Sequence, residues 1–569
     1  MHLRPLAAFL ALGVLLGLLA SAGAASPPPV AGEDGMVASV HALATRVGND
    51  ILRRGGNAVD AAVAVGYTLA VVYPAAGNLG GGGFMTIRFA DGRTTFLDFR
   101  EKAPLAATAG MFLDRAGNVM PKAGLLGYRA VAVPGSVAGL DLALRKYGSM
   151  SRRQVMAPAI ALAEKGFKLD EADAAGLNEA AADFRKDPPS AAIFLNHGRP
   201  YRRGDILVQT DLAKVLRRIA RQGADGFYRG PIAERIVAAS RANGGLLSKA
   251  DFAQYAVREM RPITCSYKGY VLYSAPPPSS GGVALCEMLN ILDPYPLKDW
   301  GFNSAKTIHY MVEAMRHAYV DRNDDIGDPD FIENPVGRLL DKGYAAAIRA
   351  HIDPDKAGNS RDIGPGTPPH EGSETTHYSV VDKAGNAVAV TYSLNNFFGA
   401  RVTPAGTGIL LNDTMDDFSE KPGVPNIFGL VQGKADVIAP HKTPLSSMSP
   451  TVVTKDGKLV MVLGSAGGAR IITIVLQTFL DVVDYGMTVQ EAVDAPRFHH
   501  QWKPDKIFVE PFAISADTRA ALERMGYTVT QQSPWGDAVA ILLGGPALGK
   551  TVSGYCCFAG VDDRRAARY

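Results

Sequence analysis

Residues 375–395 read TTHYSVVDKAGNAVAVTYSLN, and this stretch gives the clearest β-hairpin pattern in the chain. Two runs rich in Val, Thr and Tyr flank the turn sequence DKAGN. A hairpin centred on Ala384 places Thr375 opposite Ser393. Because cross-strand neighbours lie about 5 Å apart, we expect the hydroxyl groups of Thr375 and Ser393 to be neighbours at the open end of the hairpin.

The sequence just before this hairpin has a different composition. Residues 354–374 are rich in Gly, Pro and charged residues and contain little that could be buried. This composition predicts an exposed, mobile loop. The loop ends at Glu374, directly before the hairpin.

Two glycine-rich turns lie elsewhere in the chain. Residues 77–83, GNLGGGG, follow two helix patterns, one over residues 45–54 and one capped by Asn57, and precede two strands that end at Arg100. No Gly-Lys-Ser/Thr follows these glycines, so they do not predict a phosphate-binding loop. Residues 464–470, GSAGGAR, join a strand to an apolar helix. Such a junction leaves backbone N–H groups unpaired, and these groups can hold a developing oxyanion.

Helical patterns dominate residues 130–350. One helix, expected over residues 305–321, places His309, Glu313 and His317 on one face. Spacing alone is a weak indication of metal binding. We therefore expect this face to pack on the core and predict no metal site.

Composition restricts the class of protein. The chain has 569 residues, of which 47% are hydrophobic and 20% charged, as in soluble folded proteins. A single core rarely exceeds about 300 residues, so we expect two domains or one large intertwined unit. The 59 basic residues nearly balance the 56 acidic ones, which argues against nucleic acid or a membrane surface as the main partner.

The N-terminus has the pattern of a secretory signal peptide. A short basic start precedes the apolar residues 6–20, and small residues follow at positions 21–25. An uncleaved membrane anchor is the alternative, but this apolar run is short for a span of about 20 residues. We expect residues 1–24 to be a cleaved signal peptide and the mature protein to be periplasmic or secreted.

Four cysteines are too few for a disulfide scaffold or a Cys-rich zinc module. Cys265 and Cys286 could pair in an oxidising compartment, and Cys556 and Cys557 are adjacent in the sequence. We expect all four to be buried or idle thiols.

Seven short motifs occur in a fixed order along the chain. They are NLGGGGFM at 78–85, DFRE at 98–101, PPSSGG at 277–282, TTHYS at 375–379, MDDF at 415–418, PLSSMSP at 444–450 and GG at 467–468. On these motifs, the chain from about residue 36 to its C-terminus resembles the gamma-glutamyltransferases (glutathione hydrolases), which are N-terminal nucleophile hydrolases.

The resemblance implies an α+β fold, the αββα four-layer sandwich of the N-terminal nucleophile hydrolases. It also implies that the precursor cuts itself between Glu374 and Thr375. The products would be a heavy chain, residues 25–374, and a light chain, residues 375–569, that stay together as one heterodimeric unit. A Thr hydroxyl needs a base to become a nucleophile. The freed α-amine of Thr375, with a pKa near about 8, would lie on the same residue. The resemblance implies neither a metal nor a cofactor.

The resemblance also implies a role for each site residue. The implied catalytic residues are Thr375 as nucleophile, Ser393 as the hydroxyl that orients it, and Gly467 and Gly468 as oxyanion-hole donors. The implied substrate-binding residues are Arg100 with Ser446 and Ser447 for the α-carboxylate, Asp417 for the α-ammonium group, and Asn395 and Thr414. Thr414 stands where relatives commonly have Gln or Glu, and Phe428 stands where some bacterial relatives have a lid Tyr. These two departures leave room for an altered substrate preference.

The implied reaction transfers the γ-glutamyl group of glutathione and related compounds to water, amino acids or dipeptides. The expected partners are therefore small molecules, and no nucleic acid. Two alternatives stay open. One is an acylase of the same fold that acts on glutaryl-type side chains, and the other is a non-catalytic exported solute-binding protein.

Overall fold

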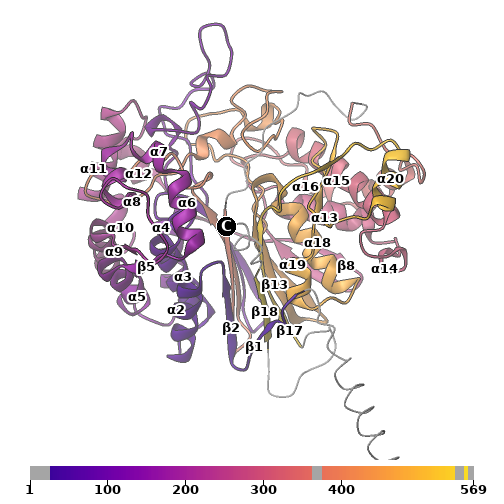
Figure 1. Ribbon diagram of the computed structural model, residues 1–569, viewed down its shortest axis with the longest axis horizontal. Helices are drawn as coiled ribbons and strands as arrows, with labels where there is room; N and C mark the ends of the chain where they lie inside the picture. Colours follow the sequence, from indigo (N-terminus) through magenta and orange to yellow (C-terminus); the bar gives the residue numbers. More distant parts are fainter. Residues whose placement is uncertain (1–25, 362–374, 545–556, 562–569) are drawn as a thin grey trace, which may run out of the picture.

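Two β-sheets pack face to face in the middle of the molecule, and helices cover the outer face of each sheet (Figure 1). The structure, a computed structural model, describes residues 26–361, 375–544 and 557–561. The predicted signal peptide, the end of the predicted mobile loop with Glu374, and Cys556 lie outside the described residues. The arrangement is the four-layer αββα sandwich that the motifs imply.

The predicted hairpin lies inside the first sheet. This sheet has six strands in the order β2-β10-β11-β3-β4-β7. Their bounds are β2 (Gly35–Ser39), β10 (Thr376–Asp382), β11 (Ala387–Ser393), β3 (Gly82–Arg88), β4 (Thr94–Phe99) and β7 (Arg258–Met260). His377 pairs with Thr391 and Val380 with Val388, which is the register that centring on Ala384 predicts.

The second sheet has seven strands in the order β1-β18-β17-β13-β12-β9-β8. Their bounds are β1 (Val30–Gly32), β18 (Cys557–Val561), β17 (Asp537–Leu543), β13 (Lys458–Ala466), β12 (Thr451–Lys455), β9 (Tyr270–Ser274) and β8 (Ile263–Tyr267). Two small sheets lie outside the sandwich and contain β5 (Phe167–Lys168), β6 (Ile206–Leu207), β14 (Phe498–His499), β15 (Ile507–Val509) and β16 (Val529–Gln531).

The helices divide between the two outer layers (Figure 1). The six-stranded sheet is covered by α2 (Ala42–Arg53), α3 (Ala58–Val72) and α4 (Ser136–Tyr147). The seven-stranded sheet is covered by α13 (Gly281–Leu292), α18 (Ile471–Val483) and α19 (Val489–Asp494), and α15 (Ala305–Asp325) packs on α13. The other helices are α5 (Arg152–Lys165), α6 (Glu171–Glu179), α7 (Ala181–Phe184), α8 (Pro188–Phe194), α9 (Thr210–Gln222), α10 (Asp225–Tyr228), α11 (Pro231–Ala242), α12 (Lys249–Gln254), α14 (Leu297–Trp300), α16 (Val336–Leu339), α17 (Lys342–Ala350) and α20 (Ala516–Arg524).

Alternation along the strands fills the spaces between the layers. On β10, Val380 belongs to the core between the first sheet and its helices, whereas its neighbour Val381 belongs to the core between the two sheets. Val388 and Ala389 divide in the same way on β11. Successive side chains of a strand point to opposite faces, so a hairpin that is apolar on both faces must lie in the middle of a layered fold.

The predicted helix boundaries agree with the structure to within a few residues. Asn57 caps α3, accepting hydrogen bonds from the backbone N–H groups of Val59 and Asp60. The helix expected from residue 45 begins earlier, at Ala42, because His41 supplies its N-cap. Short strands, β5 to β9, interrupt the mainly helical region that we expected over residues 130–350.

The expectation of idle thiols is wrong for Cys265 and Cys286, which form a disulfide bond. Cys265 on β8 faces Cys286 on α13 with their Cα atoms 5.7 Å apart, a separation that a disulfide can span. The sequence could not show that this strand and this helix pack together.

The helix face with His309 and Glu313 is buried and bound to other protein groups. The two nitrogens of His309 lie 2.7 Å from the Tyr527 hydroxyl and 2.8 Å from the Asp353 carbonyl oxygen. Glu313 accepts hydrogen bonds from Tyr527 and from the backbone N–H of Gly358. Among the described residues, no helix is long and apolar enough to span a bilayer.

Candidate active site

Thr375 lies at the start of β10, beside the end of β11. Its side chain is buried, 3% exposed, and its Oγ1 lies 3.5 Å from the Ser393 Oγ. The predicted proximity of these two hydroxyls is therefore confirmed. Ser393 Oγ also accepts a 2.9 Å hydrogen bond from the backbone N–H of Asn395, a residue with φ of +83°. The positive φ turns the chain at the end of β11 and keeps Asn395 beside the two hydroxyls.

A small cavity opens beside Thr375 and encloses about 20 Å³. Its lining includes nearly all the residues expected to bind substrate. The lining residues are Arg100, Arg322, Thr375, Ser393, Asn395, Asp417, Phe428, Leu430, Leu445, Ser446, Ser447, Met448, Gly468, Ala469 and Ile471. This space fits about one water molecule.

Arg100 and Asp417 form a buried ion pair across this cavity. Arg100 follows β4 and is 2% exposed, and Asp417 ends the 3₁₀ turn η2 (Thr414–Asp417). Burial acts to lower the pKa of Arg100, but the carboxylates of Asp417 and Glu101 outweigh burial and raise this pKa. This pair gives the cavity a cation and an anion in contact, the complement of an α-carboxylate and an α-ammonium group.

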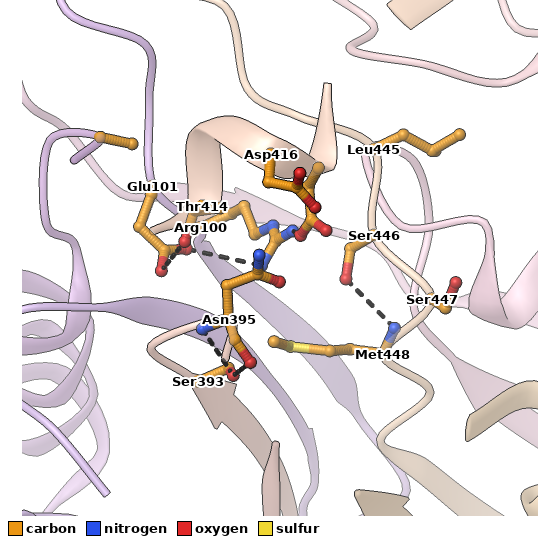
Figure 2. Close-up of polar contacts among 12 residues, drawn as sticks. Arg100, Glu101, Ser393, Asn395, Thr414, Asp416, Leu445, Ser446, Ser447 and Met448 are labelled. Atoms are coloured by element: carbon orange, nitrogen blue, oxygen red, sulfur yellow. Dashed lines mark hydrogen bonds and ion pairs between the residues drawn. The ribbon is translucent and has the colours of Figure 1, made fainter. Parts of the chain in front are cut away.

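Ser446 and Ser447 also line this cavity (Figure 2), on a loop held by the residues before α13. The backbone N–H of Ser280 donates to the Ser446 carbonyl oxygen at 2.8 Å, and the Ser280 hydroxyl donates to the same oxygen at 2.7 Å. Ser279 donates to the Met448 carbonyl oxygen at 2.7 Å. The PPSSGG motif thus fixes the backbone of the PLSSMSP motif.

Gly467 and Gly468 form the turn between β13 and α18, as the sequence predicts. Their φ angles are +138° and +54°, a region that L side chains rarely adopt. Gly468 lines the cavity with Thr375 and begins a short 3₁₀ turn that leads into α18. A strand that turns into a helix in this way directs free N–H groups at one point, where a developing negative charge can be held.

The two departures from the family pattern also lie at this site. Thr414 donates a 2.8 Å hydrogen bond to Glu101, whose carboxylate is fully buried beside the Arg100 guanidinium (Figure 2). Phe428 lines the cavity and is 5% exposed. Its backbone carbonyl accepts a hydrogen bond from Gln501, so this loop is held without a side-chain hydroxyl.

Two charged residues at the site, Glu101 and Arg322, were not assigned a role from the sequence. Glu101 belongs to the DFRE motif but carried no expected function. Arg322, on α15, lines the cavity and contacts Ser447. In the sequence it is a single basic residue directly after the helix expected over residues 305–321, and one basic residue does not by itself indicate a site.

This geometry supports acyl transfer from a substrate that bears both an α-carboxylate and an α-ammonium group. It combines a Thr hydroxyl at a strand start, a glycine turn suited to an oxyanion, and an opposite-charge pair. The described residues contain no group of three or more His, Cys, Asp or Glu side chains arranged to hold a metal ion.

The comparisons with known proteins agree with the site. A glutathione hydrolase proenzyme from Pseudomonas sp. (strain A14) is 58% identical over 95% of this chain and 94% of its own length. One from Escherichia coli (strain K12) is 52% identical over 91% of this chain and 89% of its own. The crystal structure of a cephalosporin acylase from Bacillus halodurans superposes with a TM-score of 0.82, at 27% identity, and covers 96% of this chain and 97% of its own. The family model for gamma-glutamyltranspeptidase matches residues 44–568, and the chain belongs to that family.

Proposed function

We propose that this chain is a self-processing γ-glutamyl hydrolase and transferase that acts on glutathione and related γ-glutamyl compounds. The observation that carries the proposal is the Arg100–Asp417 ion pair in the same cavity as the Thr375 hydroxyl. A γ-glutamyl group carries an α-carboxylate and an α-ammonium group. Its carboxylate can pair with Arg100 and its ammonium group with Asp417, in place of the ion pair between these two residues.

The reaction proceeds by attack of the Thr375 Oγ on the γ-amide carbon. The α-amine of the cleaved Thr375 accepts the hydroxyl proton, and Ser393 orients the hydroxyl. The backbone N–H groups of Gly467 and Gly468 stabilise the oxyanion. The C–N bond breaks, the leaving amine takes the proton, and a γ-glutamyl ester forms on Thr375. Water, an amino acid or a dipeptide then attacks the ester and releases the γ-glutamyl group.

Substrate binding divides between the two charges of the γ-glutamyl group. Arg100, Ser446 and Ser447 bind the α-carboxylate, because a guanidinium and two hydroxyls supply donors on one side. Asp417 binds the α-ammonium group, with Asn395 beside it. Thr414 acts indirectly, through its hydrogen bond to Glu101.

Processing gives three segments, a signal peptide of residues 1–24, a heavy chain of residues 25–374 and a light chain of residues 375–569. The two chains form a heterodimer, and the protein is periplasmic or secreted. The Cys265–Cys286 disulfide supports export, because disulfides persist mainly in oxidising compartments.

A same-fold acylase for glutaryl-type side chains is the second candidate. Such substrates lack the α-ammonium group, so they leave the buried Asp417 carboxylate without a partner. The retained Asp417 and the higher identity to glutathione hydrolase proenzymes than to the cephalosporin acylase favour γ-glutamyl substrates.

Mass spectrometry of the purified protein tests the proposal. We expect two chains, one that begins at Thr375 and one that begins near Ala25, and hydrolysis of γ-glutamyl p-nitroanilide faster than of the glutaryl anilide. Thr375→Ala should leave one inactive polypeptide that has lost only its signal peptide. An active or internally cut Thr375→Ala protein would refute the mechanism, and an uncut but active wild type would do the same. A single intact wild-type chain without activity would point to a solute-binding protein.

A further inference from the structure

Arg322 is a buried arginine in the substrate cavity that forms no ion pair with any described carboxylate. It lies near the C-terminal end of α15, is 1% exposed and lines the cavity. Its guanidinium donates to the Asn323 side-chain oxygen at 2.7 Å and to the Ser447 Oγ at 3.2 Å. Within the part of the chain that the structure describes, its Nε has no hydrogen-bond acceptor.

Arg316, six residues earlier on the same helix, shows how this fold treats a buried guanidinium that has a structural role. Arg316 forms ion pairs with Glu313 and Asp505, and it donates to the Ser360 hydroxyl. A buried charge without a counter-charge is costly. Burial lowers the pKa of Arg322 to about 10, so the group is still charged at neutral pH. The carboxylates of Asp436 and Asp417 act on Arg322 without contacting it, and an anion that enters the cavity would supply a counter-charge in direct contact.

The hydrogen bond from Arg322 also sets the direction in which the Ser447 hydroxyl points. A guanidinium has only donors, so the Ser447 Oγ must act as the acceptor in this contact. The O–H of Ser447 is then available to donate into the cavity. Ser446 is set in the same way, because its Oγ accepts a 3.1 Å hydrogen bond from the backbone N–H of Met448.

We propose that Arg322 is a positioning and specificity residue, which holds Ser447 as a hydrogen-bond donor and thereby makes this wall of the cavity selective for the α-carboxylate. The inference rests on the proposed function. A serine hydroxyl free to rotate could also accept a hydrogen bond from an ammonium group. With Arg322 in place, one lone pair of the Ser447 oxygen is occupied and the guanidinium charge repels an ammonium group beside it, so the carboxylate is preferred at this wall.

Three p-nitroanilide donors separate the two charges of the substrate. The γ-glutamyl anilide has both charges, the glutaryl anilide has only the carboxylate, and the 4-aminobutanoyl anilide has only the ammonium group. A donor that turns over too slowly is measured instead as its free acid, by competitive inhibition of γ-glutamyl anilide hydrolysis. Denaturing gels first establish that each variant has been cut into two chains.

We expect Arg322→Met to raise KM about 10- to 100-fold for the two carboxylate donors, the effect of one charge-assisted hydrogen bond. The kcat should change little, because the carboxylate is bound equally before and during the reaction. The 4-aminobutanoyl donor should change by less than about threefold. Arg322→Lys, which keeps a charge and a donor, should show a smaller loss with the same selectivity. If the Arg322→Met protein is not cleaved into two chains, the Arg322→Lys variant provides the test of donor selectivity.

Ser447→Ala and the double variant test whether Arg322 acts through Ser447. Because both single variants would remove the same interaction, adding Arg322→Met to Ser447→Ala should cost less than about threefold more. Arg316→Met is the control, since it removes a buried guanidinium of the same helix that is outside the cavity. It should lower stability without changing the relative KM values of the three donors.

An equal loss on all three donors, or additive losses in the double variant, would overturn the role of Arg322 and leave the proposed function intact. A wild-type protein that is cut into two chains but hydrolyses no γ-glutamyl donor would refute the proposed function itself. The two failures are therefore distinguishable in the same set of measurements.

Discussion

Asp417→Asn should shift the preference of the enzyme from γ-glutamyl toward glutaryl donors. In the free protein Asp417 is paired with Arg100 inside the cavity, and in the proposed complex it pairs with the substrate ammonium group. The asparagine has nearly the same shape but no charge. Its amide can also turn an N–H toward the ammonium group, which repels it.

The two donors should respond in opposite directions. The γ-glutamyl donor loses a charge-assisted hydrogen bond, worth about 1.5–3 kcal/mol, so its kcat/KM falls about 10- to 150-fold relative to that of the glutaryl donor. The glutaryl donor has no ammonium group to lose. In the wild type it must also separate Arg100 from Asp417, whereas in the variant Arg100 is buried without its partner and gains one when the carboxylate binds. Its kcat/KM should stay constant or rise up to about tenfold.

Rates on the two p-nitroanilides, measured at substrate concentrations well below KM, give the ratio directly. Asp416→Asn is the matched control. Asp416 is also buried, but it accepts from the backbone N–H of Ile427 and forms no ion pair with Arg100. Burial raises the pKa of Asp416 well above its usual value. Equal losses on both donors in Asp417→Asn would refute the assignment of Asp417 to the ammonium group.

Three further predictions concern stability. Burial raises the pKa of Glu420 from 4.5 to about 7, so the folded state holds a proton that the unfolded state releases and stability falls as pH rises across this range. Glu420→Gln should therefore raise the free energy of unfolding at about pH 8, by up to about 3 kcal/mol, and leave it unchanged near about pH 4.5; an equal gain at both pH values would contradict the cause. Gly464→Ala should give little soluble protein, because a Cβ there would lie 2.3 Å from the buried His377 ring; a soluble variant with wild-type melting temperature would contradict this packing. Replacing Cys265 and Cys286 by Ala should cost about 3 kcal/mol, because the disulfide closes a loop with a sequence separation of 21; calorimetry in which the reduced wild type melts like the oxidised protein would argue against it.

Local pattern was enough to predict the elements that build the site. The hairpin was predictable with its register because period-two alternation and one short turn leave a single pairing. This register by itself places Thr375 beside Ser393. The glycine turn at Gly467 was predictable because a strand pattern and a helix pattern meet there with no room for another connection.

Contacts between distant segments were not predictable in the same way. The resemblance assigned Arg100 and Asp417 to the substrate, but it could not show that the two residues pair with each other when the cavity is empty. Arg322 was missed because its proposed role follows from the lack of an ion-pair partner among the described residues, which the sequence does not show. A buried arginine becomes informative only once the position of every nearby carboxylate is known. The Cys265–Cys286 disulfide likewise depends on how α13 packs on β8.

The strand order has a consequence for the heavy and light chains that the proposed cut between Glu374 and Thr375 would give. In the first sheet, β10 and β11 of the light chain are inserted between β2 and β3 of the heavy chain. In the second sheet, four light-chain strands, β18, β17, β13 and β12, lie between β1 and β9 of the heavy chain. Neither polypeptide can leave without breaking backbone ladders on both of its flanks, in two sheets at once. The two chains are therefore expected to acquire their contacts when the uncut precursor folds. Dilution should not separate the heavy chain from the light chain at any concentration at which the protein stays folded.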